Sequence, residues 1–263
     1  MESSPKRVAM RWEQPATLKF AYPIVILPEL FTTSSHLSLL TGYLANLGWE
    51  VCALDLYAAV DSRRGSFGDL FELAAAALAE IGREVIVLGH GLGGLLALAL
   101  DRQPRVAASI AVAPALPAFR SLLLGGLRNR LAALRGAPLW PPSGRRLFEF
   151  VADADRFQRD ALIHGLTPAV ATALREVVHG RIELAPIGTK PRLMVAGDSD
   201  IFAPYERVVQ FAAAAGAQLA TLPGRGHWLI GGRALEKTVG EIQRFLIKNL
   251  GRDLLLLYPE DPS

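Results

Sequence analysis

The 263-residue sequence contains a single cysteine, Cys52, and little excess charge of either sign. One cysteine forms neither an intrachain disulfide nor a cysteine metal site, so we expect a core residue in a reducing cytoplasm. The formal net charge of +3 gives no reason to expect a nucleic-acid partner. The longest apolar stretch, Val85–Leu100, contains a histidine and four glycines and therefore predicts no membrane span. The first residues also lack the apolar stretch of a signal peptide.

Short apolar, β-branched segments alternate with helical patterns along most of the chain. YPIVIL at 22–27 and EVIVL at 84–88 are typical of buried strands. This alternation predicts an α/β fold with a mostly parallel sheet flanked by helices. It stops in a segment rich in Leu, Pro and Arg, which we interpret as a helical lid over the carboxyl edge of the sheet, where ligands bind in open α/β folds. The predicted boundaries are 1–114 and 190–263 for the core and 115–189 for the lid.

A glycine-rich turn, GHGLGG at Gly89–Gly94, lies between a predicted strand and a predicted helix. A dinucleotide-binding loop requires a carboxylate about 20 residues later, at the end of the next strand. The next strand, in VAASIAVAPAL, contains none, which disfavours this interpretation. A nucleophile elbow, G-x-S-x-G, requires small residues on both sides of a tight turn. Gly89 and Gly93 meet that requirement, with Gly91 at the serine position.

An acid and a histidine follow the turn in the order that a hydrolase triad requires. Asp198 and Asp200 come directly after the predicted strand at 191–196, and His227 comes after the predicted strand at 218–222. The carboxyl ends of parallel strands lie at one edge of a sheet, so we expect these side chains to meet the glycine turn there. A histidine oriented by a carboxylate can move a proton.

These motifs resemble the α/β-hydrolase-fold superfamily, in its lysophospholipase and monoacylglycerol-lipase-like branch. The resemblance rests on GHGLGG, on G-x-x-D at Gly197–Asp200 and on G-H at Gly226–His227. It implies an α/β-hydrolase fold with a lid, and its spacing selects Asp200 as the partner of His227. It also implies that the backbone amides of Leu92 and of Leu30 or Phe31 form an oxyanion hole.

Two positions depart from the family pattern. Gly91 provides no hydroxyl, so no acyl-enzyme forms there and the site contains an open space. The turn after the first strand contains Pro28-Glu29, where the family has His-Gly. Glu29 is interpreted either as a loop residue facing water or as a second proton carrier facing His227, which would oppose an oxyanion. Gly91 is either native or a substituted serine, and the altered turn favours a native loss.

Several other residues are candidates for the pocket lining or for surface contacts. Arg120–Arg146 contains six arginines interleaved with leucines and no carboxylate. This is typical of a lid helix with a solvated basic face; the alternatives are weak contact with an anionic membrane surface and attraction of an acidic substrate. The candidate pocket residues are Phe31, His90, Trp140, His164 and Trp228.

Three functional hypotheses follow, all with a small apolar or acidic molecule as ligand and without a cofactor or a metal. The first is a hydrolase-fold enzyme that lacks a serine nucleophile and uses His227 and Asp200 for acid–base chemistry on a carbonyl or acyl compound. Elimination, isomerisation, cyclisation and C–C cleavage are reactions of this kind. The second is an ester, thioester or lactone hydrolase, acting through water or inactivated by loss of its serine. The third is a non-catalytic ligand-binding protein.

Overall fold

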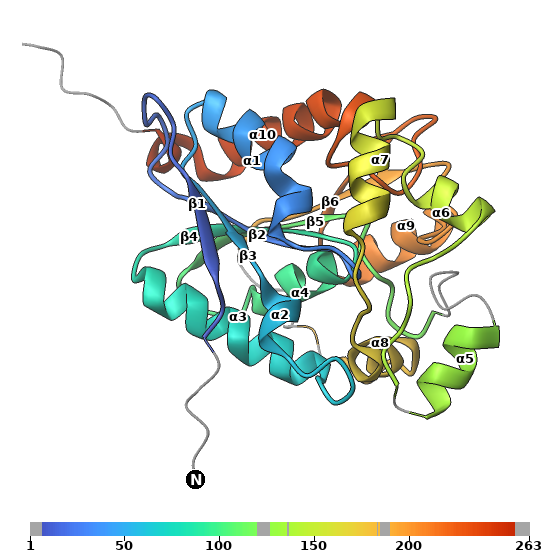
Figure 1. The fold of residues 1–263 in the computed structure, drawn as a ribbon. Coiled ribbons are helices and arrows are strands. Elements are labelled where there is room, and N and C mark those ends of the chain that lie inside the picture. Colours follow the sequence, from blue (N-terminus) through green and yellow to red (C-terminus); the bar gives the residue numbers. More distant parts are fainter. Residues whose placement is uncertain (1–6, 120–126, 136, 183, 185–189, 256–263) are drawn as a thin grey trace, which may run out of the picture.

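The computed structural model describes residues 7–119, 127–135, 137–182, 184 and 190–255, except for the side chains of residues 127, 130, 133, 134 and 252. Its centre is a seven-stranded sheet with the order β1-β3-β2-β4-β5-β6-β7 (Figure 1). Strand β1 is antiparallel to β3, and the remaining neighbours pair in parallel. The predicted α/β architecture is confirmed. The strands are β1 (Met10–Glu13), β2 (Ile24–Leu27), β3 (Val51–Leu54), β4 (Val85–His90), β5 (Val106–Val112), β6 (Arg192–Gly197) and β7 (Gln218–Leu222).

The edge strand β1 is the one strand that the sequence pattern did not predict. Its four residues, MRWE, are exposed or only half-buried. A short edge strand of this kind buries too little surface to show apolar alternation, and its position is fixed by hydrogen bonds to β3 rather than by burial.

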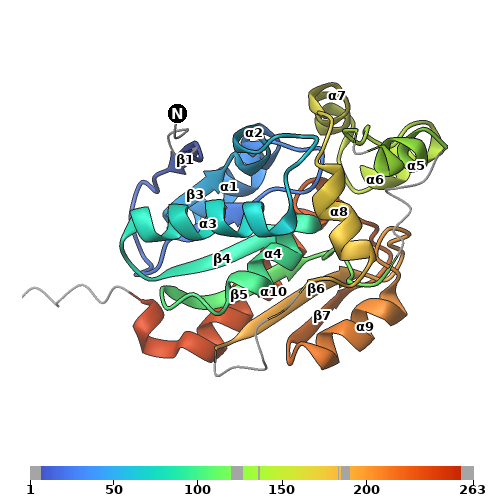
Figure 2. The same cartoon turned by 90° about the horizontal axis from the view of Figure 1, so that it is seen from below.

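Helices cover both faces of the sheet. Helices α1 and α10 lie on one face, and α3, α4 and α9 lie on the other (Figures 1 and 2). The ends of α3 show how the sequence sets these elements: Ser66 caps its first turn by accepting from the Asp69 amide, and Gly82 ends it at φ 77°. The helices outside the predicted lid are η1 (Ser34–Leu37), α1 (Ser38–Asn46), α2 (Leu56–Ala59), α3 (Phe67–Ile81), α4 (Leu92–Leu100), α9 (Tyr205–Ala214), η3 (Gly232–Ala234), α10 (Leu235–Leu250) and η4 (Gly251–Leu254).

Strand β4 and helix α4, which flank the glycine turn, lie inside the core. All the residues of β4 and of α4 are buried. A helix that is apolar on every side is stable only where other parts of the protein shield all of its faces from water. The turn between the two elements is therefore fixed within the core. No helix in the described part of the chain is long and apolar enough to cross a membrane.

The described residues of the predicted lid segment contain four helices between β5 and β6. They gather at one end of the sheet (Figure 1). Backbone hydrogen bonds join this segment to the core: for example, Thr167 N–H donates to Phe31 O at 2.9 Å, and Ala173 N–H donates to Gly65 O at 3.2 Å. The four helices are α5 (Leu127–Leu134), α6 (Arg145–Phe150), α7 (Arg156–Gly165) and α8 (Ala171–Val178).

The predicted basic stretch is only partly described. Arg120 lies outside the described residues, as does the side chain of Arg130. Arg128 stacks on the ring of Trp140, with 4.0 Å between the guanidinium carbon and the ring centroid. Arg145 pairs with Glu149 within helix α6 at 3.6 Å. Contact of this stretch with an anionic membrane surface stays a prediction.

A buried ion pair joins the end of α4 to the sheet. Arg192 donates from Nε and Nη2 to Asp101 Oδ2 at 3.0 and 2.7 Å, and both side chains are at most 3% exposed. Ser109 Oγ donates to the other carboxylate oxygen at 3.2 Å, and Arg192 Nη1 donates to Ala215 O at 2.8 Å. A buried pair stabilises a fold only while both partners are present.

We expect Asp101→Ala to lower the free energy of unfolding by about 3–5 kcal/mol, because it removes the carboxylate that balances a buried guanidinium. Urea denaturation measures this change. The matched control is Glu241→Ala, which removes an exposed ion pair with Arg244 and should cost at most about 1 kcal/mol. Equal effects of the two substitutions would contradict the structural role of the buried pair.

Candidate active site

The glycine turn between β4 and α4 is as tight as the elbow pattern predicts. A Cβ atom at Gly89 would lie 1.9 Å from Gly93 O, and one at Gly93 would lie 2.4 Å from Leu27 O. Gly91 has φ 55° and ψ −115°, a conformation that side chains rarely adopt, and its N–H donates to Val112 O at 2.9 Å. The sequence therefore needs glycine on both sides of the turn for close packing.

His227 and Asp200 form a buried hydrogen-bonded pair at the carboxyl edge of the sheet. His227 Nδ1 lies 2.8 Å from Asp200 Oδ2. The other carboxylate oxygen accepts from the amides of Phe202 and Ala203 at 2.7 and 3.1 Å. Asp198 is exposed and accepts from the Gly224 amide at 2.7 Å instead. Asp200 thus orients the imidazole and leaves Nε2 facing the glycine turn.

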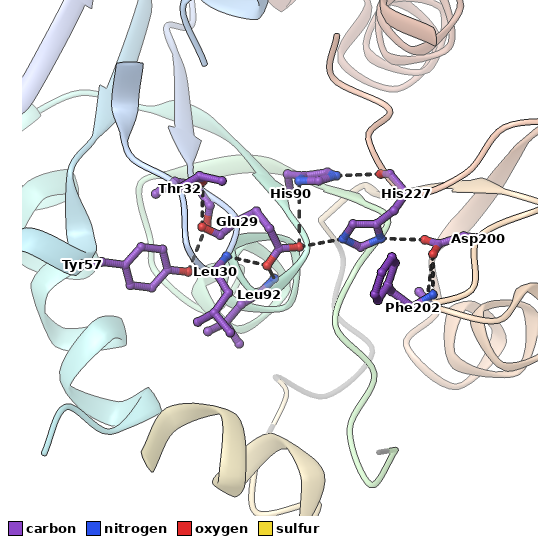
Figure 3. Close-up of polar contacts among 11 residues, drawn as sticks. Glu29, Leu30, Thr32, Tyr57, His90, Leu92, Asp200, Phe202 and His227 are labelled. Carbon is purple, nitrogen blue, oxygen red and sulfur yellow. Dashed lines mark hydrogen bonds and ion pairs between the residues drawn. The ribbon is translucent and has the colours of Figure 1, made fainter. Parts of the chain in front are cut away.

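The Glu29 carboxylate is the third member of this group and is completely buried. Its Oε2 lies 3.0 Å from His227 Nε2 (Figure 3). Its Oε1 accepts from the Leu30 amide at 2.5 Å and from the Leu92 amide at 3.1 Å. Leu30, rather than Phe31, is therefore the first amide of the predicted pair. The interpretation of Glu29 as a loop residue facing water is wrong, because the side chain is buried and its oxygens contact the Leu30 and Leu92 amides and His227.

The space beside Gly91 is filled, so the expectation of an open space there is also wrong. A Cβ atom at position 91 would lie only 1.3 Å from Glu29 Oε2. The carboxylate therefore occupies the volume of a side chain at position 91. It also occupies the two amides that were expected to bind an oxyanion. Glu29 in this position leaves no room for a side chain at position 91, so the residues at these two positions depend on each other.

Two residues that the sequence analysis did not single out hold the Glu29 turn in place. Thr32 donates to Glu29 O from its amide at 3.1 Å and from Oγ1 at 2.7 Å. Tyr57 donates its hydroxyl to Pro28 O at 3.1 Å. Burial and the charge of Glu29 raise the pKa of Tyr57, which keeps this hydroxyl protonated. Tyr57 follows β3 closely, and its place just beyond a predicted strand was the available signal.

Opposing effects set the charge of His227. Burial lowers its pKa, but the Asp200 and Glu29 carboxylates outweigh burial and raise the pKa of His227 to about 10. His227 is therefore an imidazolium at neutral pH and donates to a carboxylate from each nitrogen. Charge-assisted hydrogen bonds of this kind are stronger than those between neutral groups.

His90, the neighbour of Gly91, is a neutral member of the same cluster. Burial, and then the charge of His227, lower the pKa of His90 to about 4. Its Nε2 lies 2.9 Å from the carbonyl oxygen of His227, so this nitrogen carries the hydrogen. Its Nδ1 lies 3.9 Å from Glu29 Oε2, too far for a hydrogen bond.

A small apolar cavity adjoins Glu29, Gly91 and His227. Its volume is about 10 Å³, which is room for about one water molecule. The rings of Phe150 and Phe202 pack against His227 at centroid distances of 5.3 and 5.2 Å. The remaining lining comes from Pro114, Ala115, Leu116, Phe119, Leu174, Val177, Phe202 and Ala203.

The structure places the other predicted pocket residues elsewhere. Trp140 is 44% exposed and stacks with Arg128, and His164 is exposed, with Nδ1 2.7 Å from Asp160 O. Neither lines the small cavity. Trp228 is buried against His90 and lines a separate cavity of about 250 Å³ with His36. Phe31 is buried at φ 71° and does not line the small cavity either.

The fold and the site together define a class of protein. An elbow between a buried strand and helix, with an acid and a histidine after later strands of a mostly parallel sheet, is the arrangement of an α/β hydrolase.

The comparisons with known proteins agree with that class. The profile of the Alpha/beta hydrolase family matches residues 28–241, and the chain belongs to this family. No curated protein matches the sequence significantly. Similar solved structures include a monoacylglycerol lipase from Paleococcus ferrophilus, at 18% identity over 92% of this chain and 99% of that one, with a TM-score of 0.69. A thermophilic esterase from Thermogutta terrifontis has 17% identity over 94% and 96%, with a TM-score of 0.70. At these identities the likeness shows the fold alone.

The overlap between Glu29 and a side chain at position 91 predicts the cost in stability of placing a serine there. We expect Gly91→Ser to lower the free energy of unfolding by about 2–3 kcal/mol more than the control Gly144→Ser, because it expels a charged, hydrogen-bonded carboxylate. Gly144 has a similar φ, 57°, with open space around it. When Glu29 is also replaced by glycine, Gly91→Ser should cost no more than Gly144→Ser. The coupling energy between positions 29 and 91, measured by urea denaturation, is then up to about 3 kcal/mol. Equal costs at positions 91 and 144 would contradict the overlap.

The buried carboxylates predict an imidazolium at position 227. We expect the ¹⁵N shifts of His227 to be those of an imidazolium near pH 8, where an ordinary histidine is neutral, and His90 to stay neutral near pH 6. The pKa of His227 in the folded protein lies above the ordinary value of 6.5. The stabilisation that the protonated His227 gives the folded state is therefore complete below about pH 6.5 and is lost as the pH rises through about 10. Glu29→Gln should lower the pKa of His227. If the ¹⁵N chemical shifts of His227 near pH 8 were those of a neutral imidazole, the assignment of a positive charge to His227 would be wrong.

Proposed function

We propose that this protein is an α/β-hydrolase-fold enzyme that transfers protons without forming an acyl-enzyme, using Glu29, His227 and Asp200. One observation carries the proposal. The Glu29 carboxylate lies where the side chain of a serine nucleophile would lie, with its Oε2 3.0 Å from His227 Nε2. A carboxylate thus lies where a catalytic triad has its serine hydroxyl. Unlike the hydroxyl, the carboxylate has no proton to give up and can itself act as a base.

The charges of the pair suit coupled proton transfer. His227 carries a proton on Nε2 and acts as the general acid, while the Glu29 carboxylate acts as the base. When the Glu29–His227 hydrogen bond opens, a carbonyl compound placed between the two groups loses a proton from carbon to Glu29 Oε2 and gains one on its oxygen from His227 Nε2. Asp200 holds the ring so that Nε2 stays in place. Positioned acid–base groups of this kind contribute roughly 10²- to 10⁴-fold to a rate.

The chemistry fits elimination, isomerisation, cyclisation or C–C cleavage, because each requires a proton to leave one atom and reach another. The cavity lining favours a small apolar carbonyl or acyl compound. Since the cavity has room for about one water molecule, substrate binding requires side chains that line the cavity to move.

Hydrolysis by an activated water is less well supported. The Leu30 and Leu92 amides already hold Glu29 Oε1, so they are not free to bind an oxyanion. His227 also already holds the proton that a general base would have to take from water. The esterase and lipase names of similar structures belong to those proteins.

One observation favours a second candidate, a hydrolase in which Glu29 itself is the nucleophile. Its two oxygens are separated in role, because backbone amides hold Oε1 while Oε2 faces His227. In this mechanism Oε2 displaces a leaving group from an alkyl carbon and forms an ester of Glu29. Esterification removes the Glu29 charge, so the pKa of His227 falls and the ring can activate a water against the ester carbon. The same two amides then stabilise the oxyanion that forms from Oε1.

The test of the first candidate follows exchange of carbon-bound hydrogen in D₂O by ¹H NMR. The probes are phenylacetone and phenylpyruvate, which offer a carbonyl next to an apolar ring without and with a negative charge. We expect the protein to accelerate exchange, and Glu29→Gln to slow it by about 100-fold, because the isosteric amide is not a base. The control is Asp198→Asn. Asp198 lies in the same loop as Asp200, and its carboxylate contacts neither His227 nor Glu29.

The remaining outcomes separate the candidates. Exchange that is equally fast in Glu29→Gln would overturn the first candidate. Single-turnover reaction with alkyl esters and alkyl halides in H₂¹⁸O would place ¹⁸O in the Glu29 peptide if Glu29 is the nucleophile. If a ligand bound but the protein neither accelerated hydrogen exchange nor took up ¹⁸O at Glu29, the result would favour a non-catalytic binding protein.

A further inference from the structure

His90 Nδ1 is a buried acceptor for which the described residues offer no hydrogen-bond donor. Its ring is completely buried, and Nδ1 makes no hydrogen bond there. The carbonyl of His227 can only accept, so Nε2 holds the hydrogen of the neutral ring and Nδ1 holds a lone pair. That lone pair faces Glu29 Oε2 at 3.9 Å (Figure 3). Two electron-rich atoms thus face each other in a buried space.

His227 Nε2 completes a triangle with these two atoms. His90 Nδ1, His227 Nε2 and one oxygen of Glu29 all lie within 4.8 Å of one another. Bonds of about 2.0–2.1 Å to a tetrahedral ion place neighbouring ligand atoms about 3.3 Å apart. The Oε2–Nε2 distance of 3.0 Å is already close to that value. The distance from His90 Nδ1 to Glu29 Oε2, 3.9 Å, has to shorten by about half an ångström, and His90 Nδ1 now lies within 4.8 Å of His227 Nε2.

Each of the three side chains also has a partner that fixes its orientation. Asp200 binds the far nitrogen of His227, the His227 carbonyl binds the far nitrogen of His90, and two amides hold the other oxygen of Glu29. Metal-binding histidines usually have such a carboxylate or carbonyl on their second nitrogen. The small cavity beside Glu29, Gly91 and His227 has room for about one water molecule as a fourth ligand.

From this geometry we propose that Glu29, His90 and His227 form a binding site for a divalent ion of the zinc class. Two imidazoles and one carboxylate are a ligand set that zinc accepts with one open position. On binding, the ion takes the place of the proton between Glu29 and His227, which leaves His227 Nε2 for the solvent. The ion-loaded and proton-sharing states exclude each other, so the site does not rest on the proposed proton transfer.

The test measures zinc bound per chain after EDTA treatment, addition of Zn²⁺ and dialysis, together with the affinity from calorimetry. We expect one zinc per chain in the wild type. Changes to partners of metal ligands cost about 10- to 100-fold in affinity, so losing a ligand in His90→Gln or Glu29→Gln should cost at least about 100-fold. Gln at position 90 keeps a donor for the His227 carbonyl. The matched control is His164→Gln, which removes an exposed lid histidine and should retain one zinc.

A second measurement needs only the wild type, in case a variant does not fold. Zinc should shift the ¹⁵N signals of His90 Nδ1 and His227 Nε2 and leave those of His164 unchanged. Unchanged signals at the first two nitrogens, or equal zinc affinity in His90→Gln and the wild type, would overturn the proposal. Zinc binding without hydrogen exchange would refute only the proton-transfer function, and exchange without zinc binding would refute only the metal site.

Discussion

The constraint on which the site depends is the burial of one carboxylate. An ionised carboxylate in a protein interior is strongly unfavourable unless donors and an opposite charge surround it. Glu29 has both: two backbone amides hold Oε1, and the His227 imidazolium faces Oε2. Asp200 in turn balances the second N–H of His227. Each of these charges is stable in the core only because the next one is there.

The same constraint explains the glycine at the elbow. The Leu92 amide lies at the start of α4, and a helix N-terminus favours a negative charge. In a serine hydrolase such an amide stabilises a transient oxyanion. Here the protein supplies a permanent anion from the neighbouring turn. That anion reaches the amide only because no side chain at position 91 blocks it.

The sheet provides the rigidity that this arrangement needs. Glu29 and His227 are 198 positions apart in the chain, yet both follow parallel strands that end at the same edge. Helix α4 follows the glycine turn directly and is buried on all sides, which holds the turn in place. The Asp101–Arg192 pair anchors the C-terminal end of α4 to β6. Rigid elements hold donor and acceptor atoms at defined distances, which is what separates a functional constellation from a loose group of charges.

The sequence by itself determined the α/β fold, the tight glycine turn and the order of acid and histidine, because these depend on local patterns: apolar periodicity, glycine spacing and position after a strand. The resemblance to the α/β-hydrolase family selected Asp200, rather than Asp198, as the partner of His227. Only the tertiary structure decided which way Glu29 points, that His90 Nδ1 faces it, and that Trp140 and His164 lie away from the cavity. Side-chain direction in a turn depends on donors from distant segments, here the Leu92 amide and His227, and no local pattern records which buried charges will compensate one another.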